Sequence, residues 1–146
     1  MTSSANFGIP MKSRLAIAAI FKHENAYLRE WIEFHRLVGF DHFFLYDNDG
    51  SDETQTLLKG YEDAGIVTRH PWMHLDGTRR DSRTPFGGRD KNHMAFGHAA
   101  AHHRNDCEWL MKVDIDEFVM PTEEESVLPL IGAYKREETR GLQLPR

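Results

Sequence analysis

Residues 15–21 read Leu-Ala-Ile-Ala-Ala-Ile-Phe, a continuous apolar run without alternating polar residues. A strand of this composition is covered on both faces, which is typical of a parallel sheet between layers of helices. The run is far shorter than the roughly 20 apolar residues that a membrane-spanning helix needs. It therefore predicts a buried strand in an α/β domain.

Patterns for two helices follow on the C-terminal side of this run. The first helix is expected to begin with Asn25 as its cap and to end at Gly39. The second is expected to be capped by Asp52, with Gln55 as its partner in a capping-box-like pair, and to end at Gly65. The first helix has an apolar face at spacing i, i+3, i+4 and i+7, formed by Leu28, Trp31, Ile32 and His35.

The other patterns complete an alternating order of strands and helices. The order β-α-β-α-β-loop-α-β predicts an α/β fold with a mainly parallel sheet and right-handed crossovers. Residues 1–13 are expected to form a flexible N-terminal arm, and residues 14–146 a single domain. The further elements are expected as strands at 42–46, 66–69 and 109–113, a helix at 91–103, a short helix around 123–134 and the start of a strand at 141–144.

The composition is that of one globular domain with a modest acidic excess. The chain has 146 residues, of which 40% are hydrophobic, and this suits a single domain with a substantial core. The formal net charge of −5, from 18 basic and 23 acidic residues, argues against a dedicated nucleic-acid-binding protein. Cys107 is the one cysteine, which excludes an internal disulfide and fits a reducing compartment. Because the first residues lack the apolar core of a signal peptide and no transmembrane segment is predicted, we expect a cytoplasmic location.

Acidic residues follow three of the predicted strands. Ligands of open α/β sheets bind beyond the carboxyl ends of the strands, so these residues are expected to meet at one edge. Mutual repulsion of carboxylates costs stability unless a cation or a set of donors compensates it, and we therefore expect a cation-dependent site. Helix capping is the simpler role for Asp52 taken alone. The acidic residues are Glu24 after the first strand, Asp47, Asp49 and Asp52 after the second, and Asp114, Asp116 and Glu117 after the fourth.

The pair Asp114-Ile-Asp116 is the sharpest of these features. Alternate residues of an extended segment point the same way, so both carboxylates are expected to face one ligand. A small number of hard oxygen ligands suits Mg²⁺ or Mn²⁺, which take phosphate oxygens as further ligands. A lone DxD pattern occurs by chance in many proteins, but here it follows an apolar strand at the ligand-binding edge.

The long polar connection 71–90 contains four arginines, including Arg83, and Lys91 lies just beyond it. Two interpretations remain open: the cationic side chains clamp phosphates beside a metal–carboxylate site, or they belong to a solvated loop. His98 and His102 are one helical turn apart, as two zinc ligands would be. The alanines between them are typical of packing, so a core or surface role is expected for this pair. The glycine patterns of P-loops and dinucleotide-binding turns are absent.

The ordered set of motifs resembles glycosyltransferases of the family-2-like and family-92-like group, the DUF23-type proteins. The resemblance covers roughly residues 14–121, and the set is more specific than any of its parts. The motifs are Ala18-Ala-Ile-Phe-Lys-His-Glu24, Tyr27-Leu-Arg-Glu-Trp-Ile-Glu-Phe-His35, Gly39-Phe-Asp-His-Phe-Phe-Leu-Tyr-Asp-Asn48 with Ser51-Asp52, and Trp109-Leu-Met-Lys-Val-Asp-Ile-Asp-Glu-Phe118.

The resemblance implies a GT-A fold, which is Rossmann-like, and transfer of a sugar from a UDP- or GDP-sugar donor to a glycan, lipid or protein acceptor. By this resemblance Asp47, with Asp49 or Asp52 nearby, holds the nucleoside, and Glu24 lines the nucleotide pocket. Asp114 approaches the ribose or the metal, and Asp116 coordinates Mn²⁺ or Mg²⁺ on the diphosphate. A divalent ion is an effective Lewis acid for a departing diphosphate, and metal dependence is expected.

The pattern also departs from the family. GT-A domains place their acceptor-binding half after the DxD motif, and only about thirty residues follow Asp116, so we expect a donor half without a full acceptor half. Two explanations are open: the chain is a truncated or fragmentary version of the enzyme, or a partner supplies the rest. No general base is identifiable. Two other functions are open: a non-catalytic nucleotide-sugar-binding remnant, and a phosphatase with Asp114 as nucleophile and Asp116 as acid. An unmatched end of the sheet near Leu142 predicts self-association through exposed apolar surface.

Overall fold

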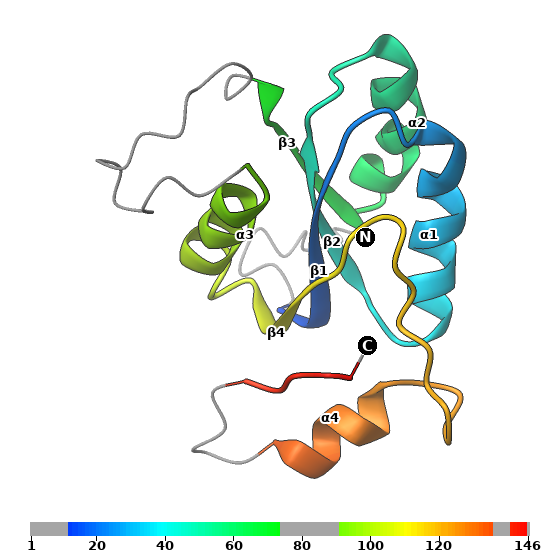
Figure 1. Ribbon diagram of the computed structural model, residues 1–146, viewed down its shortest axis with the longest axis vertical. Helices are drawn as coiled ribbons and strands as arrows, with labels where there is room; N and C mark the ends of the chain where they lie inside the picture. Colours follow the sequence, from blue (N-terminus) through cyan, green and yellow to red (C-terminus); the bar gives the residue numbers. More distant parts are fainter. Residues whose placement is uncertain (1–11, 74–90, 136–140, 146) are drawn as a thin grey trace, which may run out of the picture.

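The computed structural model describes residues 12–73, 91–135 and 141–145. The order of elements confirms the predicted alternation of strands and helices (Figure 1). The elements are β1 (Ser13–Phe21), α1 (Asn25–Leu37), β2 (His42–Asp47), α2 (Asp52–Asp63), β3 (Val67–Pro71), α3 (Lys91–His102), β4 (Cys107–Lys112) and α4 (Leu128–Tyr134). β1 thus begins one residue before the predicted start of the domain.

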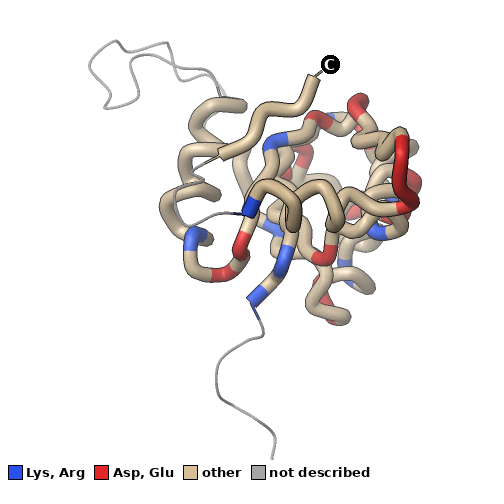
Figure 2. The backbone as a smooth tube through the Cα atoms, turned by 90° about the horizontal axis from the view of Figure 1, so that it is seen from below, with Lys and Arg blue, Asp and Glu red and all other residues tan. Residues whose placement is uncertain are grey.

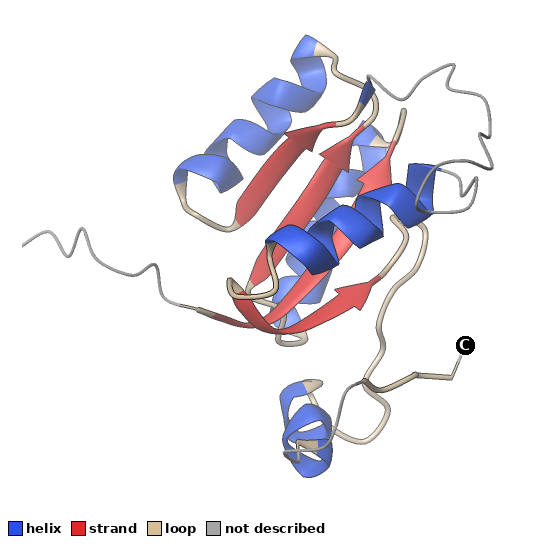
Figure 3. Cartoon of the chain, turned by 90° about the vertical axis from the view of Figure 1, so that its left-hand side faces the viewer, coloured by secondary structure: helices blue, strands red, loops and turns tan. Residues whose placement is uncertain are grey.

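The strands form one parallel sheet in the order β3-β2-β1-β4. Figure 3 shows the strand arrows pointing the same way, with α4 away from the sheet. β1 occupies an interior position, and its residues from Leu15 to Ala19 are at most 4% exposed. The apolar run that predicts a doubly covered strand is therefore confirmed, as is the α/β, Rossmann-like class expected of a GT-A fold.

Helices cover both faces of the sheet. α1 and α2 pack on one face, where Trp31, Ile32 and Leu58 meet the odd-numbered residues of β1 in the larger core. α3 packs on the other face, where Ala95 and Ala99 meet Ala16 and Ala18 of β1, together with Phe44 and Tyr46 of β2. The small alanines let α3 approach the sheet closely, and the alternation along each strand decides which side chains face α3.

The helix starts differ from those predicted. Ser51, not Asp52, is the N-cap of α2, and its hydroxyl accepts a hydrogen bond from the backbone N–H of Thr54 at 3.2 Å. Asn25 is the first residue of α1 and caps nothing; its side-chain oxygen instead accepts the Thr54 hydroxyl at 2.8 Å. This contact joins the starts of the two helices. Both predicted caps were wrong, for two different reasons. Ser51, one residue before Asp52, takes the N-cap position of α2, and the side chain of Asn25 is bonded to Thr54 of another helix.

The two predicted ends of α1 and α2 are confirmed. Gly39 and Gly65 each follow the helix by two residues and have positive φ angles of 117° and 73°. A Cβ at Gly39 would lie 2.6 Å from the hydroxyl oxygen of Ser126, which donates to the backbone oxygen of Val38 at 3.1 Å. Gly39 is therefore needed both for its backbone conformation and for close approach of the C-terminal segment.

The C-terminal part departs most from the prediction. α4 begins at Leu128 rather than near residue 123, because Pro129 fits the first turn of a helix and residues 123–127 form bends. Residues 141–145 form no strand, so that expectation was wrong. Leu130, Tyr134 and Leu142 are exposed, while self-association stays a prediction.

Figure 2 shows Lys and Arg residues interspersed with Asp and Glu residues along the described backbone. In the part of the chain that the structure describes, every helix is too short or too polar to cross a bilayer.

Candidate active site

The turns after β1, β2 and β4 lie at one edge of the sheet because the strands are parallel. The chain leaves β1 into α1 on one face and reaches β4 from α3 on the other face. The strand order therefore reverses between β1 and β4, and such a switch point is where open α/β sheets bind ligands. The residues after β1 and β4 form the candidate site.

Three carboxylates influence one another at this switch point. Burial raises the pKa of Glu24, and the negative charges of Asp116 and Asp114 raise it further, against a backbone hydrogen bond from Lys22 that lowers it. Glu24 follows β1, whereas the two aspartates follow β4, so the fold brings together acidic residues that are 90 positions apart in the sequence. The parallel strands bring the ends of β1 and β4 to one edge of the sheet, where the charges of both aspartates act on Glu24. That these carboxylates form a binding site stays a prediction.

The Asp114-Ile-Asp116 segment forms a turn, not the extended segment that the sequence predicts. The N–H of Glu117 donates to the backbone oxygen of Asp114 at 3.0 Å and closes the turn. Val113 and Ile115 are nevertheless buried, while Asp114 is partly exposed and Asp116 is exposed. Both carboxylates thus lie on the solvent side although the backbone curls. The ammonium of Lys112 pairs with the Asp114 carboxylate at 2.8 Å.

A tryptophan of α1 holds this turn in place. The indole N–H of Trp31 is shared between the backbone oxygen of Glu117, at 2.9 Å, and that of Asp114, at 3.1 Å. Trp31 is fully buried, so these hydrogen bonds form away from competing water. The helical spacing predicts that Trp31 is buried, but not that its polar end fixes the acidic turn.

His35, one turn further along α1, holds the segment beyond the turn. Its Nδ1–H donates to the backbone oxygen of Trp31 at 2.8 Å, and its Nε2 accepts the backbone N–H of Val119 at 3.1 Å. Both ring nitrogens are therefore used by the backbone, with the proton on Nδ1. Burial lowers the pKa of His35, which keeps the ring neutral. Trp31 and His35 are positioning residues that the sequence alone does not reveal.

Asp47 is fully buried at the end of β2. One of its oxygens accepts the backbone N–H groups of Asp49 and Gly50, at 2.9 and 2.8 Å. Its other oxygen accepts a guanidinium hydrogen of Arg69 at 3.1 Å. Asp47 thus shapes the turn after β2 from within, and the nucleoside contact implied by the resemblance stays a prediction.

Asp49 lies nearer to the solvent than Asp47. Its carboxylate is 10% exposed, accepts the Thr54 hydroxyl at 3.3 Å and lies 3.5 Å from the Nδ1 of His23. His23 has a left-handed φ of 58°, a conformation that costs energy in a residue other than glycine. Asp52 is exposed in the first turn of α2. The β1–α1 and β2–α2 turns therefore touch through His23 and Asp49.

A shallow pocket opens beside the carboxylates on the α3 face. Asp114, Lys112 and Tyr46 line it together with Asn92 and Phe96 from the start of α3. Burial raises the pKa of Tyr46, so its phenol stays protonated. Lys91 begins α3, but its side chain and the whole of Arg83 lie outside the described residues, and their predicted phosphate contacts stay predictions.

Most of this chain is similar in sequence to known proteins of one family. The family model for glycosyltransferase family 92 matches residues 14–145. A glycosyltransferase family 92 protein of Arabidopsis thaliana is 28% identical over 127 residues, which are 86% of this chain and 20% of that protein. One from Oryza sativa is 29% identical over 108 residues, which are 72% of this chain and 16% of that protein.

A third relative, from Ricinus communis, is a glycosyltransferase family 92 protein that is 26% identical over 110 residues. The match covers 74% of this chain and 17% of that protein. The chain therefore spans only about a fifth or less of the length of the curated relatives it matches. No solved structure matches the chain.

Proposed function

The chain belongs to glycosyltransferase family 92, and from this premise we propose that it forms the nucleotide-sugar-binding part of a metal-dependent glycosyltransferase. The observation that carries the proposal is the meeting of Glu24, Asp114 and Asp116 at the switch point of the sheet. An excess of negative charge at a ligand-binding edge is suited to a cation and a phosphate ligand together.

The donor atoms fit Mn²⁺ or Mg²⁺ better than a softer metal. Such ions are held by one or two carboxylates, and waters and substrate phosphates complete the shell. Among the described residues the carboxylates of the edge do not gather as three ligand atoms within 4.8 Å of one another. Asp114 and Asp116 are therefore the two protein ligands we propose, with the remaining positions left to the diphosphate and water.

The metal, when bound, would neutralise a diphosphate and act as a Lewis acid for its departure. The other roles belong to side chains of the chain itself. Trp31 and His35 keep the acidic turn in one conformation, which reduces the reorganisation needed on binding. Lys112 forms an ion pair with Asp114 and lines the pocket. We therefore propose that its ammonium group binds the diphosphate.

The turn after β2 is proposed to receive the nucleoside. Asp49 is partly buried and Asp52 is exposed there, and Asp47 fixes the turn through its hydrogen bonds to the backbone. In the strand order of the sheet, the turn after β1 lies between this turn and the DxD turn after β4, and its Glu24 lines the nucleotide pocket in this proposal. A UDP- or GDP-sugar is the donor class, and a glycan, lipid or protein is the acceptor class.

Calorimetry with UDP and GDP, each with and without Mn²⁺, tests the donor site. We expect binding of at least one nucleoside diphosphate that requires Mn²⁺ and weakens at least about tenfold in Asp116→Asn, a change of about 1.4 kcal/mol. Asp63→Asn is the matched control, because it removes the same charge at the far end of α2, where Asp63 pairs with Lys59. Wild-type protein that binds neither nucleotide in a Mn²⁺-dependent way would overturn the proposal.

Turnover assays separate this function from its alternatives. Donor hydrolysis or sugar transfer that is lost in Asp116→Asn marks an enzyme, whereas donor binding without either reaction marks a binding module. The family assignment leaves no support for the phosphatase hypothesis. Hydrolysis of an aryl phosphate that Asp114→Asn abolishes would reinstate it.

A further inference from the structure

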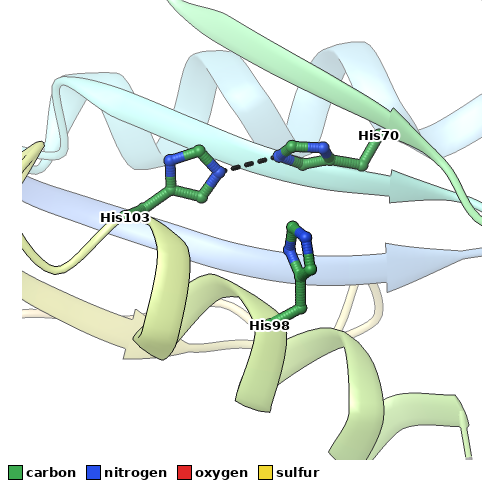
Figure 4. A group of neighbouring side chains, drawn as sticks. All are labelled: His70, His98 and His103. Atoms are coloured by element: carbon green, nitrogen blue, oxygen red, sulfur yellow. Dashed lines mark hydrogen bonds between the residues drawn. The ribbon is translucent and has the colours of Figure 1, made fainter.

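Histidines gather on the α3 face of the sheet, on segments other than the DxD turn. His70 comes from β3, His98 from α3, and His103 from the turn between α3 and β4. The register pairs His70 with Tyr46, so both side chains face α3. One nitrogen from each histidine lies within 4.8 Å of the other two. Figure 4 shows the rings of His70 and His103 joined by a hydrogen bond, with His98 pointing toward them from α3.

The hydrogen bonds show where the lone pairs lie. His103 uses its Nδ1 to bond the Asp106 carboxylate, 2.6 Å away, so its Nε2 must be the acceptor when the ring is neutral. The Nε2 of His70 lies 2.8 Å from that atom and therefore carries the shared proton. One proton thus holds together two ring nitrogens that both point into the same small space, which a metal ion can occupy in its place.

The rings are held in position by their neighbours. The His103 ring stacks on Phe44 with a centroid distance of 4.0 Å, and the His70 ring stacks on Tyr46 at 4.9 Å. The Nδ1 of His98 lies 2.8 Å from the hydroxyl of Tyr46. Such outer contacts from Asp106 and Tyr46 are what orient imidazoles in metal sites and fix which nitrogen faces the ion.

The rings of His70 and His98 are also neutral, as metal ligands must be. Burial and the neighbouring histidines lower the pKa of His70 to about 4, and the same two causes lower the pKa of His98. At neutral pH these imidazoles therefore keep unprotonated nitrogens available.

We propose that His70, His98 and His103 bind one Zn²⁺ ion, with water as the fourth ligand. Zinc–imidazole bonds of about 2.0–2.1 Å place tetrahedral ligand atoms roughly 3.3 Å apart, so the pair at 2.8 Å needs to open by about half an ångström. Binding also moves the His70 proton from Nε2 to Nδ1. Three imidazoles favour zinc over Mn²⁺ or Mg²⁺, which distinguishes this site from the carboxylate edge.

The consequence is a link between β3 and α3. The ligands come from a strand of the sheet, a helix that covers it and the turn beyond that helix, so one ion would join three segments. The ion binds the folded chain and is expected to stabilise it, because the three ligands converge only in the fold. The site is therefore expected to be structural for the α3 face.

Zinc titration of the full, tag-free chain tests the proposal. After removal of metals by a chelator, calorimetry is expected to show one tight zinc site per chain, weakened at least tenfold in His70→Gln and in His103→Gln. His102→Gln is the matched control, because His102 lies on the same helix, is exposed and stacks on His98 at 4.1 Å without joining the cluster. Asp114→Asn and Asp116→Asn are expected to leave zinc binding unchanged.

Wild-type chain that binds no zinc, or variants His70→Gln and His103→Gln that bind it as tightly as wild type, would overturn the proposal. If a variant fails to fold, the visible spectrum of the wild-type chain loaded with Co²⁺ in place of Zn²⁺ tests the proposal. The wild type is expected to give the intense visible bands of tetrahedral Co²⁺, and the weak spectrum of hydrated Co²⁺ would overturn the proposal. Asp114→Asn and Asp116→Asn are expected to bind zinc with the affinity of the wild type. Failure of the zinc proposal can therefore be distinguished from failure of the proposed nucleotide site.

Discussion

Histidines lie on both faces of the sheet, but they are used differently. On the α1 face, His35 is fully buried and both of its nitrogens bond to backbone groups, at Trp31 and Val119. On the α3 face, His70 and His103 turn their nitrogens toward each other. The difference lies in the partner of the second ring nitrogen. In His35 this nitrogen bonds to the backbone, and the ring has a structural role. In His70 and His103 it faces another imidazole, and the ring is a candidate metal ligand.

The two faces of the sheet also differ in whether they need a bound ion. The α1 face fixes the acidic turn through fully satisfied hydrogen bonds, so it acts without any bound ion. The α3 face holds a cluster that an ion would complete. The comparison predicts that changes on the first face are costly under all conditions, and that changes on the second are costly only when zinc is present.

The largest effect is expected at Trp31. Trp31→Ala removes a fully buried side chain and should lower the free energy of unfolding by about 3–5 kcal/mol in urea titrations. Trp31→Phe keeps a ring but removes the indole N–H that the carbonyls of Asp114 and Glu117 share, at a cost of about 1–3 kcal/mol. Trp109→Phe on β4 is the control. An equal cost for both phenylalanine variants would refute the role of the Trp31 indole in holding the acidic turn.

The next effect separates the two faces directly. His35→Gln is expected to cost about 1–3 kcal/mol with or without zinc, because Val119 loses a well-placed acceptor in a buried position. With free zinc at a hundred times its Kd, wild type should gain about 2.7 kcal/mol, and His70→Gln should lose this gain. Thermal unfolding with zinc and with chelator measures both, and a zinc-dependent cost of His35→Gln would contradict the contrast.

A smaller effect is expected in the pH dependence of stability. The pKa of His35 is lowered by burial, so below its ordinary value of 6.5 the unfolded chain binds a proton that the folded chain does not. Stability is therefore fully present above pH 6.5 and falls as the pH drops toward the folded-state pKa. Urea unfolding at about pH 7.5 and about pH 5.5 should show a smaller loss in His35→Gln than in wild type.

Much of the fold could be predicted because it depends on local patterns. The apolar run of β1 and the acidic residues after β1 and β4 are visible in the sequence, and parallel pairing brings those carboxylates to one edge. The curl of the DxD turn could not be predicted, since it depends on the indole of Trp31 and on a hydrogen bond from Glu117.

The remaining failures have the same physical cause. The strand expected at 141–144 has no partner strand among the described residues, and a short apolar segment does not form a strand alone. A core or surface role was expected for the pair His98 and His102, and the cluster indeed leaves His102 out but joins His98 to His70 and His103. Those residues are brought together by sheet register and by the turn after α3, which sequence spacing does not record.

The location of a bound cation tests the central claim most directly, and paramagnetic broadening by Mn²⁺ in NMR spectra measures it. In the presence of UDP or GDP, Mn²⁺ is expected to broaden the amide signals of residues 22–24 and 113–117 most strongly, and to broaden those of His70, His98 and His103 less. Asp116→Asn should abolish this broadening, and Asp63→Asn should preserve it. Nucleotide-dependent broadening centred away from the β1–β4 edge, or unchanged in Asp116→Asn, would contradict the account.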